Sequence, residues 1–177
     1  MLAGINATEI LSNNNASIYF VGIGGIAMSA VASICKEAGY SVSGSDSGSI
    51  YSPAKDVLIN SGILFNIGYK RENIKSSGAD LFILSAGEDT ANPEVKYILE
   101  HDLPRISLAE LLHSLSGEKI RVVVAGTHGK STTTGLLGHL LKNLDDSSFM
   151  AGAVLQNYDR NFYLGSGNYF IFEGDEY

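Results

Sequence analysis

Short apolar runs alternate with amphipathic segments along the first two thirds of this chain. Runs rich in β-branched or aromatic residues predict strands at 17–23, 40–43, 63–67, 81–85 and 104–106. Apolar residues at helical spacing lie between them. Three of these predicted helices have a residue pattern typical of a helix N-terminus. The patterns are Ser52 before Pro53, Asn92 before Pro93, and Ser107 paired with Glu110. This alternation is typical of a parallel α/β domain.

A polar break at 116–119 precedes a second, shorter series of elements. Val122, Val123 and Val124 predict a strand buried on both faces of a parallel sheet. The helix that follows has an apolar stripe made of Leu136, Leu137, Leu140, Leu141 and Leu144. Further strands are predicted at 149–155, 162–164 and 169–172. We therefore predict an α/β protein of two domains, a parallel-sheet domain at 1–117 and the beginning of a second domain at 118–177.

The first predicted strand runs into a glycine-rich turn, Gly22-Ile23-Gly24-Gly25-Ile26-Ala27. It resembles a Rossmann phosphate turn with Ala27 in place of the third glycine. Asp46 ends the second strand, about 20 residues further on, where an acidic residue grips a ribose hydroxyl. By itself this pattern fits an NAD-dependent oxidoreductase as well as a protein that binds another nucleotide.

The second strand-to-helix turn reads Gly126-Thr127-His128-Gly129-Lys130-Ser131. Lys130 can reach terminal phosphates and the Ser131 hydroxyl can bind Mg²⁺, as in a P-loop. The general pattern has a further glycine where this chain has Val124. An ordinary turn with a surface lysine is the alternative. The oxidoreductase hypothesis leaves this second turn unexplained. The two turns together predict that the domain at 1–117 is Rossmann-like and that 118–177 is the start of a P-loop ATPase domain. So few residues cannot close a P-loop ATPase domain, so we expect an N-terminal part of a longer protein.

The amino-acid composition limits which partners the protein can bind and in which cell compartment it can fold and work. The 177 residues include 12 basic and 19 acidic side chains, a net charge of −7, which argues against general nucleic-acid binding. A single cysteine, Cys35, excludes an internal disulfide and fits a reducing compartment. No apolar run approaches the roughly 20 residues of a membrane span, and no signal peptide is evident. We expect a cytoplasmic protein without membrane insertion; its oligomeric state is open.

Four stretches together resemble the Mur ligase family of peptidoglycan synthesis. They are IYFVGIGGIAMS, the SGSD that ends at Asp46, AGTHGKSTTT, and EGDEY at the end of the chain. The resemblance extends over nearly the whole chain from Ser17 and is closest to the members that act on UDP-N-acetylmuramate. It implies an ATP-dependent ligase that forms an amide, with ATP and Mg²⁺ as cofactors. The muramate carboxylate would become an acyl phosphate that an incoming amine attacks.

The resemblance also implies roles for particular residues. Lys130 and Glu173 would be catalytic, and Ser131 with Glu173 would bind the metal. The residues implied to bind ATP are Gly126, Thr127, His128, Gly129, Lys130, Ser131 and Thr132. Those implied to bind the UDP-sugar are Gly22, Gly24, Gly25, Ile26, Ser45, Asp46 and Asn157.

Two members of the family share these motifs and differ in the amine that they add. GIGGIAMSA and SAGEDTANPEV are more similar to the member that adds L-alanine. The segment 50–53, Tyr177, and the spacing from Asn157 to the glycines at 165 and 167 are more similar to the member that adds L-alanyl-γ-D-glutamyl-meso-diaminopimelate. We slightly favour the tripeptide. These 177 residues alone are expected to bind ligand without turnover, as a non-catalytic nucleotide-sugar module also would.

Overall fold

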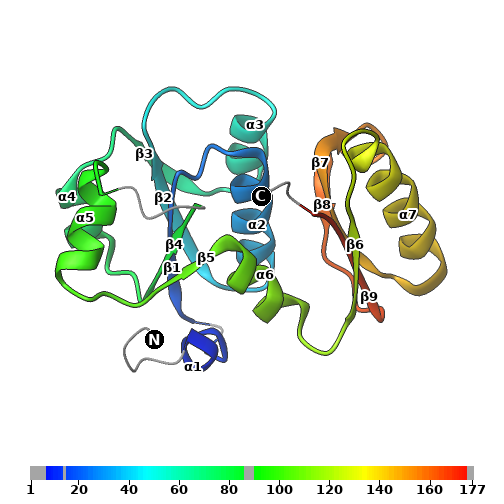
Figure 1. Ribbon diagram of the computed structural model, residues 1–177, viewed down its shortest axis with the longest axis horizontal. Coiled ribbons are helices and arrows are strands. Elements are labelled where there is room, and N and C mark those ends of the chain that lie inside the picture. Colours follow the sequence, from blue (N-terminus) through cyan, green and yellow to red (C-terminus); the bar gives the residue numbers. More distant parts are fainter. Residues whose placement is uncertain (1–6, 14, 86–89, 175–177) are drawn as a thin grey trace. The chain divides into compact units, whose positions relative to one another are not determined.

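The computed structural model describes residues 7–13, 15–85 and 90–174 (Figure 1). Residues 175–177 of EGDEY, which include Tyr177, and positions 86–89 of SAGEDTANPEV lie outside these residues. The chain divides into two compact units, Met1–Ser114 and Leu115–Tyr177. Among the described residues, no helix is both long enough and apolar enough to cross a membrane.

The first unit is built on a sheet of five parallel strands in the order β3-β2-β1-β4-β5. The strands are β1 (Ser17–Val21), β2 (Ser41–Asp46), β3 (Leu64–Ile67), β4 (Leu81–Leu84) and β5 (Arg105–Ser107). The helices are α1 (Ala7–Leu11), α2 (Ile26–Glu37), α3 (Ala54–Asn60), α4 (Arg71–Ser77), α5 (Pro93–Glu100) and α6 (Leu108–Ser116), whose last two residues are counted with the second unit. Figure 1 shows α2 and α3 on one face of the sheet, with α4 and α5 on the other. The predicted parallel α/β fold is confirmed.

The central strand β1 is buried because helices cover both faces of the sheet. Tyr19 and Phe20, which point to opposite faces, are both almost fully buried. On α2 the buried side includes small residues such as Ala30 and Ala32, which let the helix approach the sheet closely. The strand predicted from its continuous apolar run therefore lies at the middle of the sheet.

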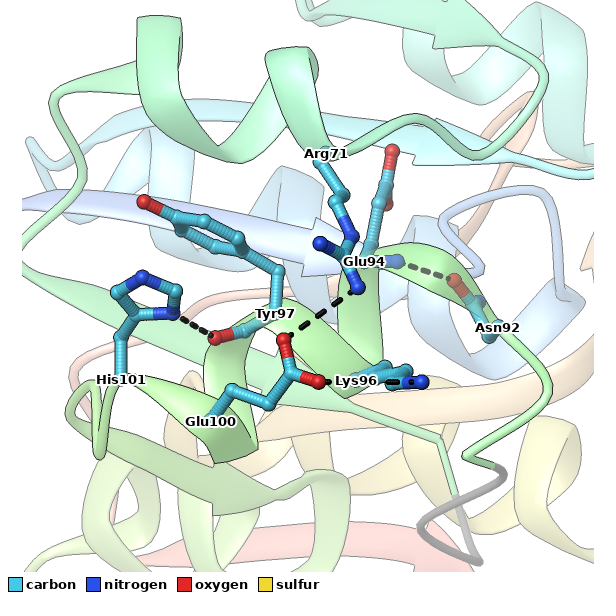
Figure 2. Close-up of polar contacts among 7 residues, drawn as sticks. All are labelled: Arg71, Asn92, Glu94, Lys96, Tyr97, Glu100 and His101. Atoms are coloured by element: carbon cyan, nitrogen blue, oxygen red, sulfur yellow. Dashed lines mark hydrogen bonds and ion pairs between the residues drawn. The ribbon is translucent and has the colours of Figure 1, made fainter.

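Two of the three predicted helix starts are confirmed. The Asn92 side chain accepts a hydrogen bond from the Glu94 N–H at 2.9 Å at the start of α5 (Figure 2). Ser107 and Glu110 form a reciprocal capping box before α6, with bonds of 2.7 and 3.2 Å. The third prediction is wrong: α3 has Pro53 at its N-cap, without a side-chain cap bond from Ser52.

The second unit has a four-stranded sheet in the order β6-β9-β7-β8. Its elements are β6 (Ile120–Val124), α7 (Lys130–Asp145), β7 (Ser148–Leu155), β8 (Arg160–Tyr163) and β9 (Tyr169–Glu173). Strand β9 pairs in parallel with both β6 and β7, and β8 is antiparallel to β7. Because β6 and β9 are parallel, their C-terminal ends, Val124 and Glu173, lie next to each other although they are far apart in the sequence.

Burial in the second unit differs from the prediction in two places. The prediction that the strand at Val122–Val124 is buried on both faces is wrong: none of the residues of β6 is buried, and Val123 is 53% exposed. Helix α7 packs through Thr134, Gly135 and Gly138, because a glycine lets the Phe149 ring approach the helix backbone. The leucines at i, i+4 and i+8 of the predicted stripe point away from this contact and are 55–80% exposed: Leu136, Leu140 and Leu144.

Candidate functional site

The glycine turn of the first unit is held by the end of β2. Gly22 follows β1 with φ of +83°, a conformation that side-chain-bearing residues rarely adopt. The N–H groups of Gly22 and Ile23 both donate to the Ser45 carbonyl at 2.9 Å. Gly25 then caps α2, which begins at Ile26. Four of the predicted nucleotide-sugar residues, Gly22, Gly24, Gly25 and Ile26, thus form one turn at the positive end of a helix.

Asp46 lies against this turn. Its Oδ2 atom accepts a hydrogen bond from the Gly24 N–H at 2.9 Å. A Cβ atom on Gly24 would lie 2.8 Å from that oxygen and 2.9 Å from Ile50 Cγ1, so a larger residue would have to displace these side chains. The structure therefore brings Asp46 and the turn together, as the sequence predicted, with the carboxylate oriented by the backbone of the turn.

Ser45, unlike Asp46, does not contact the glycine turn through its side chain. Its side chain is fully buried, and its hydroxyl donates to the carboxylate of Glu94 on α5. Ser45 thus reaches the turn through its carbonyl oxygen, not its hydroxyl. Sequence reasoning did not single out Glu94, because only the fold brings it to the end of β2.

A cavity of about 320 Å³ lies where the strand order reverses between β1 and β4. Crevices at such switch points, beyond the carboxyl ends of the strands, are where open α/β sheets bind ligands. Apolar side chains at the strand ends and polar groups from three segments line it, including Val21, Leu84, Tyr69, Ser85, Asn92 and Pro93. The sequence predicted none of these residues as a ligand contact, because Ser85 was the end of the strand predicted at 81–85 and Asn92 and Pro93 were identified only as a helix start.

Tyr69 brings a phenol to this cavity from the loop after β3. A Cβ atom on Gly22 would lie 3.6 Å from the Tyr69 hydroxyl and 3.8 Å from Ser85 Oγ, so both hydroxyls border the glycine turn. Burial, followed by the nearby carboxylates of Asp46 and Glu94, raises the pKa of Tyr69 above its usual value. The phenol is protonated at neutral pH, as a tyrosine normally is, and can donate a hydrogen bond.

The second turn lies between β6 and α7 in the other unit. Gly129 precedes the helix with φ of +78°, and α7 begins at Lys130. The Lys130 ammonium donates to the Gly126 carbonyl at 2.6 Å. The remaining predicted nucleotide residues of this loop and the first helical turn, Thr127, His128 and Thr132, are exposed. Strand, turn and helix follow in the order that an anion site requires.

Ser131 and Glu173 meet beside this turn. The Ser131 hydroxyl donates to Glu173 Oε2 at 3.1 Å. Glu173 ends β9 opposite Val124, the last residue of β6, so the sheet register places it there. The Gly152 N–H donates to its other oxygen, Oε1, and a Cβ atom on Gly152 would lie 2.9–3.0 Å from both carboxylate oxygens and 3.0 Å from Ser131 Oγ. Gly152 was missed by sequence reasoning, because nothing in the local pattern of its strand marks it.

The pair of Ser131 and Glu173 suits Mg²⁺. A hydroxyl and a carboxylate are hard oxygen ligands, and Mg²⁺ at nucleotide sites takes only one or two protein carboxylates besides phosphates and waters. Within the described part of the chain, no group of three or more His, Cys, Asp or Glu side chains is placed to hold a metal by itself. These residues therefore fit a magnesium ion that arrives with a nucleotide.

Asn157 was also predicted to contact the nucleotide sugar. It lies in the second unit, exposed in the turn at 156–159 between β7 and β8. The other predicted nucleotide-sugar residues belong to the first unit. The role of Asn157 stays a prediction.

Comparison with known proteins gives consistent matches. The family described as "Mur ligase family, catalytic domain" matches residues 17–119. A UDP-N-acetylmuramate–L-alanine ligase of Clostridium tetani is 40% identical over 162 residues, 90% of this chain and 35% of that protein. The protein of the same name from Rickettsia typhi is 38% identical over 161 residues, 90% of this chain and 32% of its own length. The chain thus spans about a third of the curated relatives it matches.

Solved structures give the same picture at the level of the fold. The UDP-N-acetylmuramate:L-alanyl-gamma-D-glutamyl-meso-diaminopimelate ligase from Neisseria meningitides superposes with a TM-score of 0.83 at 30% identity, over 92% of this chain and 53% of that one. The UDP-N-acetylmuramate-alanine ligase from Thermotoga maritima gives a TM-score of 0.76 at 27% identity, over 89% of this chain and 37% of that one.

Proposed function

The chain belongs to the Mur ligase family, and from this premise we propose that it carries the nucleotide-sugar site and the ATP site of an ATP-dependent ligase in peptidoglycan synthesis. The observation that supports this most is the presence of two phosphate-type turns of different build, one in each unit. The first turn is fastened to Asp46, and the second has a lysine together with the pair of Ser131 and Glu173.

In the first unit, the proposed ligand is UDP-N-acetylmuramate. Its diphosphate would lie at the turn from Gly22 to Ile26, where the positive end of α2 favours negative charge. The cavity beside Tyr69 and Ser85 offers an apolar wall with a few hydroxyl groups, which is the usual make-up of a small-molecule site. Asp46 orients the turn through the Gly24 N–H.

In the second unit, the proposed ligands are ATP and Mg²⁺. The backbone of the loop from Gly126 to Gly129 would surround the phosphates, and Lys130 would neutralise their charge. Ser131 and Glu173 would hold Mg²⁺, which when bound offsets the charge of the phosphates. We propose that the muramate carboxylate takes the γ-phosphoryl group of ATP, which releases ADP, and that an amine then attacks the acyl phosphate and displaces phosphate, with loss of a proton, to form the amide. Charge neutralisation and positioning, not acid–base chemistry, are what this chain would contribute.

The acceptor amine is proposed from the finer sequence features. The segment 50–53 and the glycines at 165 and 167 support the tripeptide L-alanyl-γ-D-glutamyl-meso-diaminopimelate. L-Alanine is the second candidate, since the 40%-identical relative is named as an L-alanine ligase. Comparing the two amines as substrates, in a protein that spans the full length of these relatives, separates the candidates.

Calorimetric titration of the 177 residues tests the proposal. We expect UDP-N-acetylmuramate and ATP–Mg²⁺ to bind independently and NADH not to bind. No ligated product is expected from these residues alone, because they span about a third of their relatives. Binding of NADH alone would favour the oxidoreductase hypothesis and contradict the proposal. We also propose that the protein works in the cytoplasm, where nucleotide sugars are made.

A further inference from the structure

Glu94 is a fully buried carboxylate in the first turn of α5. It accepts hydrogen bonds from the Ser45 hydroxyl on β2, from the Lys70 N–H at 3.0 Å, and from Asn73 Nδ2 at 2.6 Å. Burying a charge is costly unless hydrogen bonds compensate it, and an apolar residue would often serve stability as well. The Glu94 carboxylate accepts hydrogen bonds from separate segments of the chain, so we expect it to have a role beyond packing.

Each of its partners belongs to a segment that shapes the proposed nucleotide-sugar site. The Ser45 carbonyl holds the N–H groups of Gly22 and Ile23 in the glycine turn. Asp46, the next residue, holds the Gly24 N–H. Glu94 is thus linked through a single residue to the backbone of the turn that would bind the diphosphate.

The other two donors fasten the opposite wall of the cavity. Lys70 follows Tyr69 directly, so its bond to Glu94 fixes the backbone that presents the phenol. Asn73 also donates to the Gly68 carbonyl at 3.0 Å, on the other side of Tyr69. Asn92 lines the cavity and accepts from the Glu94 N–H, as Figure 2 shows.

The geometry points to Glu94 as the positioning residue of the nucleotide-sugar site, an inference that rests on the function proposed above. Its carboxylate joins the glycine turn, Tyr69 and the start of α5, and it reaches the ligand only through them. Residues that orient binding groups in this way decide how accurately a preformed site is held. The sequence alone marks Glu94 only as an ordinary acidic residue in the first turn of a helix.

The test compares Glu94→Gln with Glu100→Gln. Glutamine keeps the volume at position 94 but replaces one acceptor oxygen with a donor, so the three donors cannot all be satisfied. Glu100 is the matched control: it lies on the same helix, on the surface, where it pairs with Arg71 at 3.4 Å and Lys96 at 3.8 Å (Figure 2). We expect the affinity for UDP-N-acetylmuramate to fall about tenfold in Glu94→Gln, the effect of losing roughly one hydrogen bond to a charged group, and to stay within about twofold in Glu100→Gln.

Amide spectra distinguish positioning from general loss of structure. In Glu94→Gln without ligand, the ¹H–¹⁵N signals of Gly22, Ile23 and Gly24 should shift, while those of α7 and its ATP–Mg²⁺ affinity stay unchanged. Ser45→Ala removes the hydroxyl that links Glu94 to β2 and keeps the carbonyl that holds the glycine turn. It tests the same connection if Glu94→Gln folds poorly, and it should also weaken UDP-N-acetylmuramate binding. Unchanged affinity in either folded variant, with the unmodified chain binding normally, would overturn the inference and leave the proposed function intact. If the unmodified chain does not bind UDP-N-acetylmuramate, the proposed function itself fails.

Discussion

The hydroxyl of Ser131 donates to the carboxylate of Glu173 at 3.1 Å, joining the first turn of α7 to the end of β9, 42 residues further along the chain. The parallel pairing of β6 with β9 produces this contact, since it aligns Val124, the last residue before the loop, with Glu173. A hydroxyl and a carboxylate are thereby preorganised at the turn that carries Lys130.

Replacing Gly152 with alanine should disturb this pair. The added methyl group would lie 2.9–3.0 Å from the Glu173 oxygens and 3.0 Å from Ser131 Oγ, closer than a carbon atom can approach without displacement. We expect Mg²⁺-dependent ATP affinity to fall about tenfold, consistent with about 1–3 kcal/mol for overpacking. Calorimetry with and without Mg²⁺ measures this. Glu173→Gln should lose the same Mg²⁺ dependence; a Gly152→Ala protein that binds ATP–Mg²⁺ normally would contradict the role of the pair.

Replacing Lys130 with alanine should separate the two sites. Its ammonium is the charged group of the second turn, and a hydrogen bond to a charged group contributes about 1.5–3 kcal/mol. ATP–Mg²⁺ affinity should therefore fall by about 10- to 100-fold. UDP-N-acetylmuramate affinity, measured in the same calorimeter, should stay unchanged. If nucleotide-sugar binding is lost instead, the two turns have been assigned to the wrong ligands.

Gly24→Ala tests the glycine turn of the first unit against a matched control, Gly48→Ala. A methyl group on Gly24 would meet Asp46 Oδ2 at 2.8 Å and Ile50 Cγ1 at 2.9 Å, whereas one on Gly48 would meet no atom within 4 Å. We expect Gly24→Ala to weaken UDP-N-acetylmuramate binding about tenfold or more, as overpacking of about 1–3 kcal/mol implies. Gly48→Ala should leave it unchanged. Equal affinities in the two variants would rule out the proposed placement of the ligand.

Asp146, the residue after α7, should make stability depend on acid pH. A hydrogen bond from the Ser166 N–H at 2.8 Å, then bonds from the hydroxyls of Tyr163 and Ser166, lower the pKa of Asp146 from 3.8 to about 2. Because the folded-state pKa is depressed, the stabilisation is complete above about pH 4 and is lost as the pH falls toward 2. Asp146→Asn should therefore lower Tm at pH 7, and the difference from the unmodified chain should shrink toward pH 2.

The control for this substitution is Asp159→Asn. Both aspartates have φ of 51°, a conformation that asparagine tolerates, so the control reports the effect of the substitution on a left-handed residue. Thermal denaturation followed by circular dichroism gives both values of Tm. A constant difference between Asp146→Asn and the unmodified chain from pH 7 to pH 2 would contradict the role of the Asp146 hydrogen bonds.

Features encoded locally could be predicted from the sequence. The apolar run of β1, the caps at Asn92 and Ser107, and both glycine turns each depend on a few consecutive residues. The alternation of predicted strands and helices indicated the five-stranded parallel sheet. The sequence also placed Asp46 and the first turn at one site, because the ends of neighbouring parallel strands lie at the same side of a sheet. It predicted a ligand contact for Asp46, and the hydrogen bond from the Gly24 N–H is seen only in the structure.

Features that depend on distant neighbours could not be predicted. Hydrophobic periodicity showed that α7 has an apolar side, but small residues at Gly135 and Gly138 determine which side packs on the sheet, so Leu140 is exposed. The partners of Glu94 and Gly152 come from other strands and helices. Neither residue belongs to a local motif, and only the fold gives them their contacts.

The central claim is that the two turns bind two different phosphate ligands, and ¹H–¹⁵N spectra of the 177-residue chain test it most directly. We predict that UDP-N-acetylmuramate shifts the amide signals of Gly24 and Gly25 and leaves those of Gly129 and Lys130 in place, and that ATP–Mg²⁺ does the reverse. Shifts at the first turn with NADH, together with no response to either proposed ligand, would contradict the account.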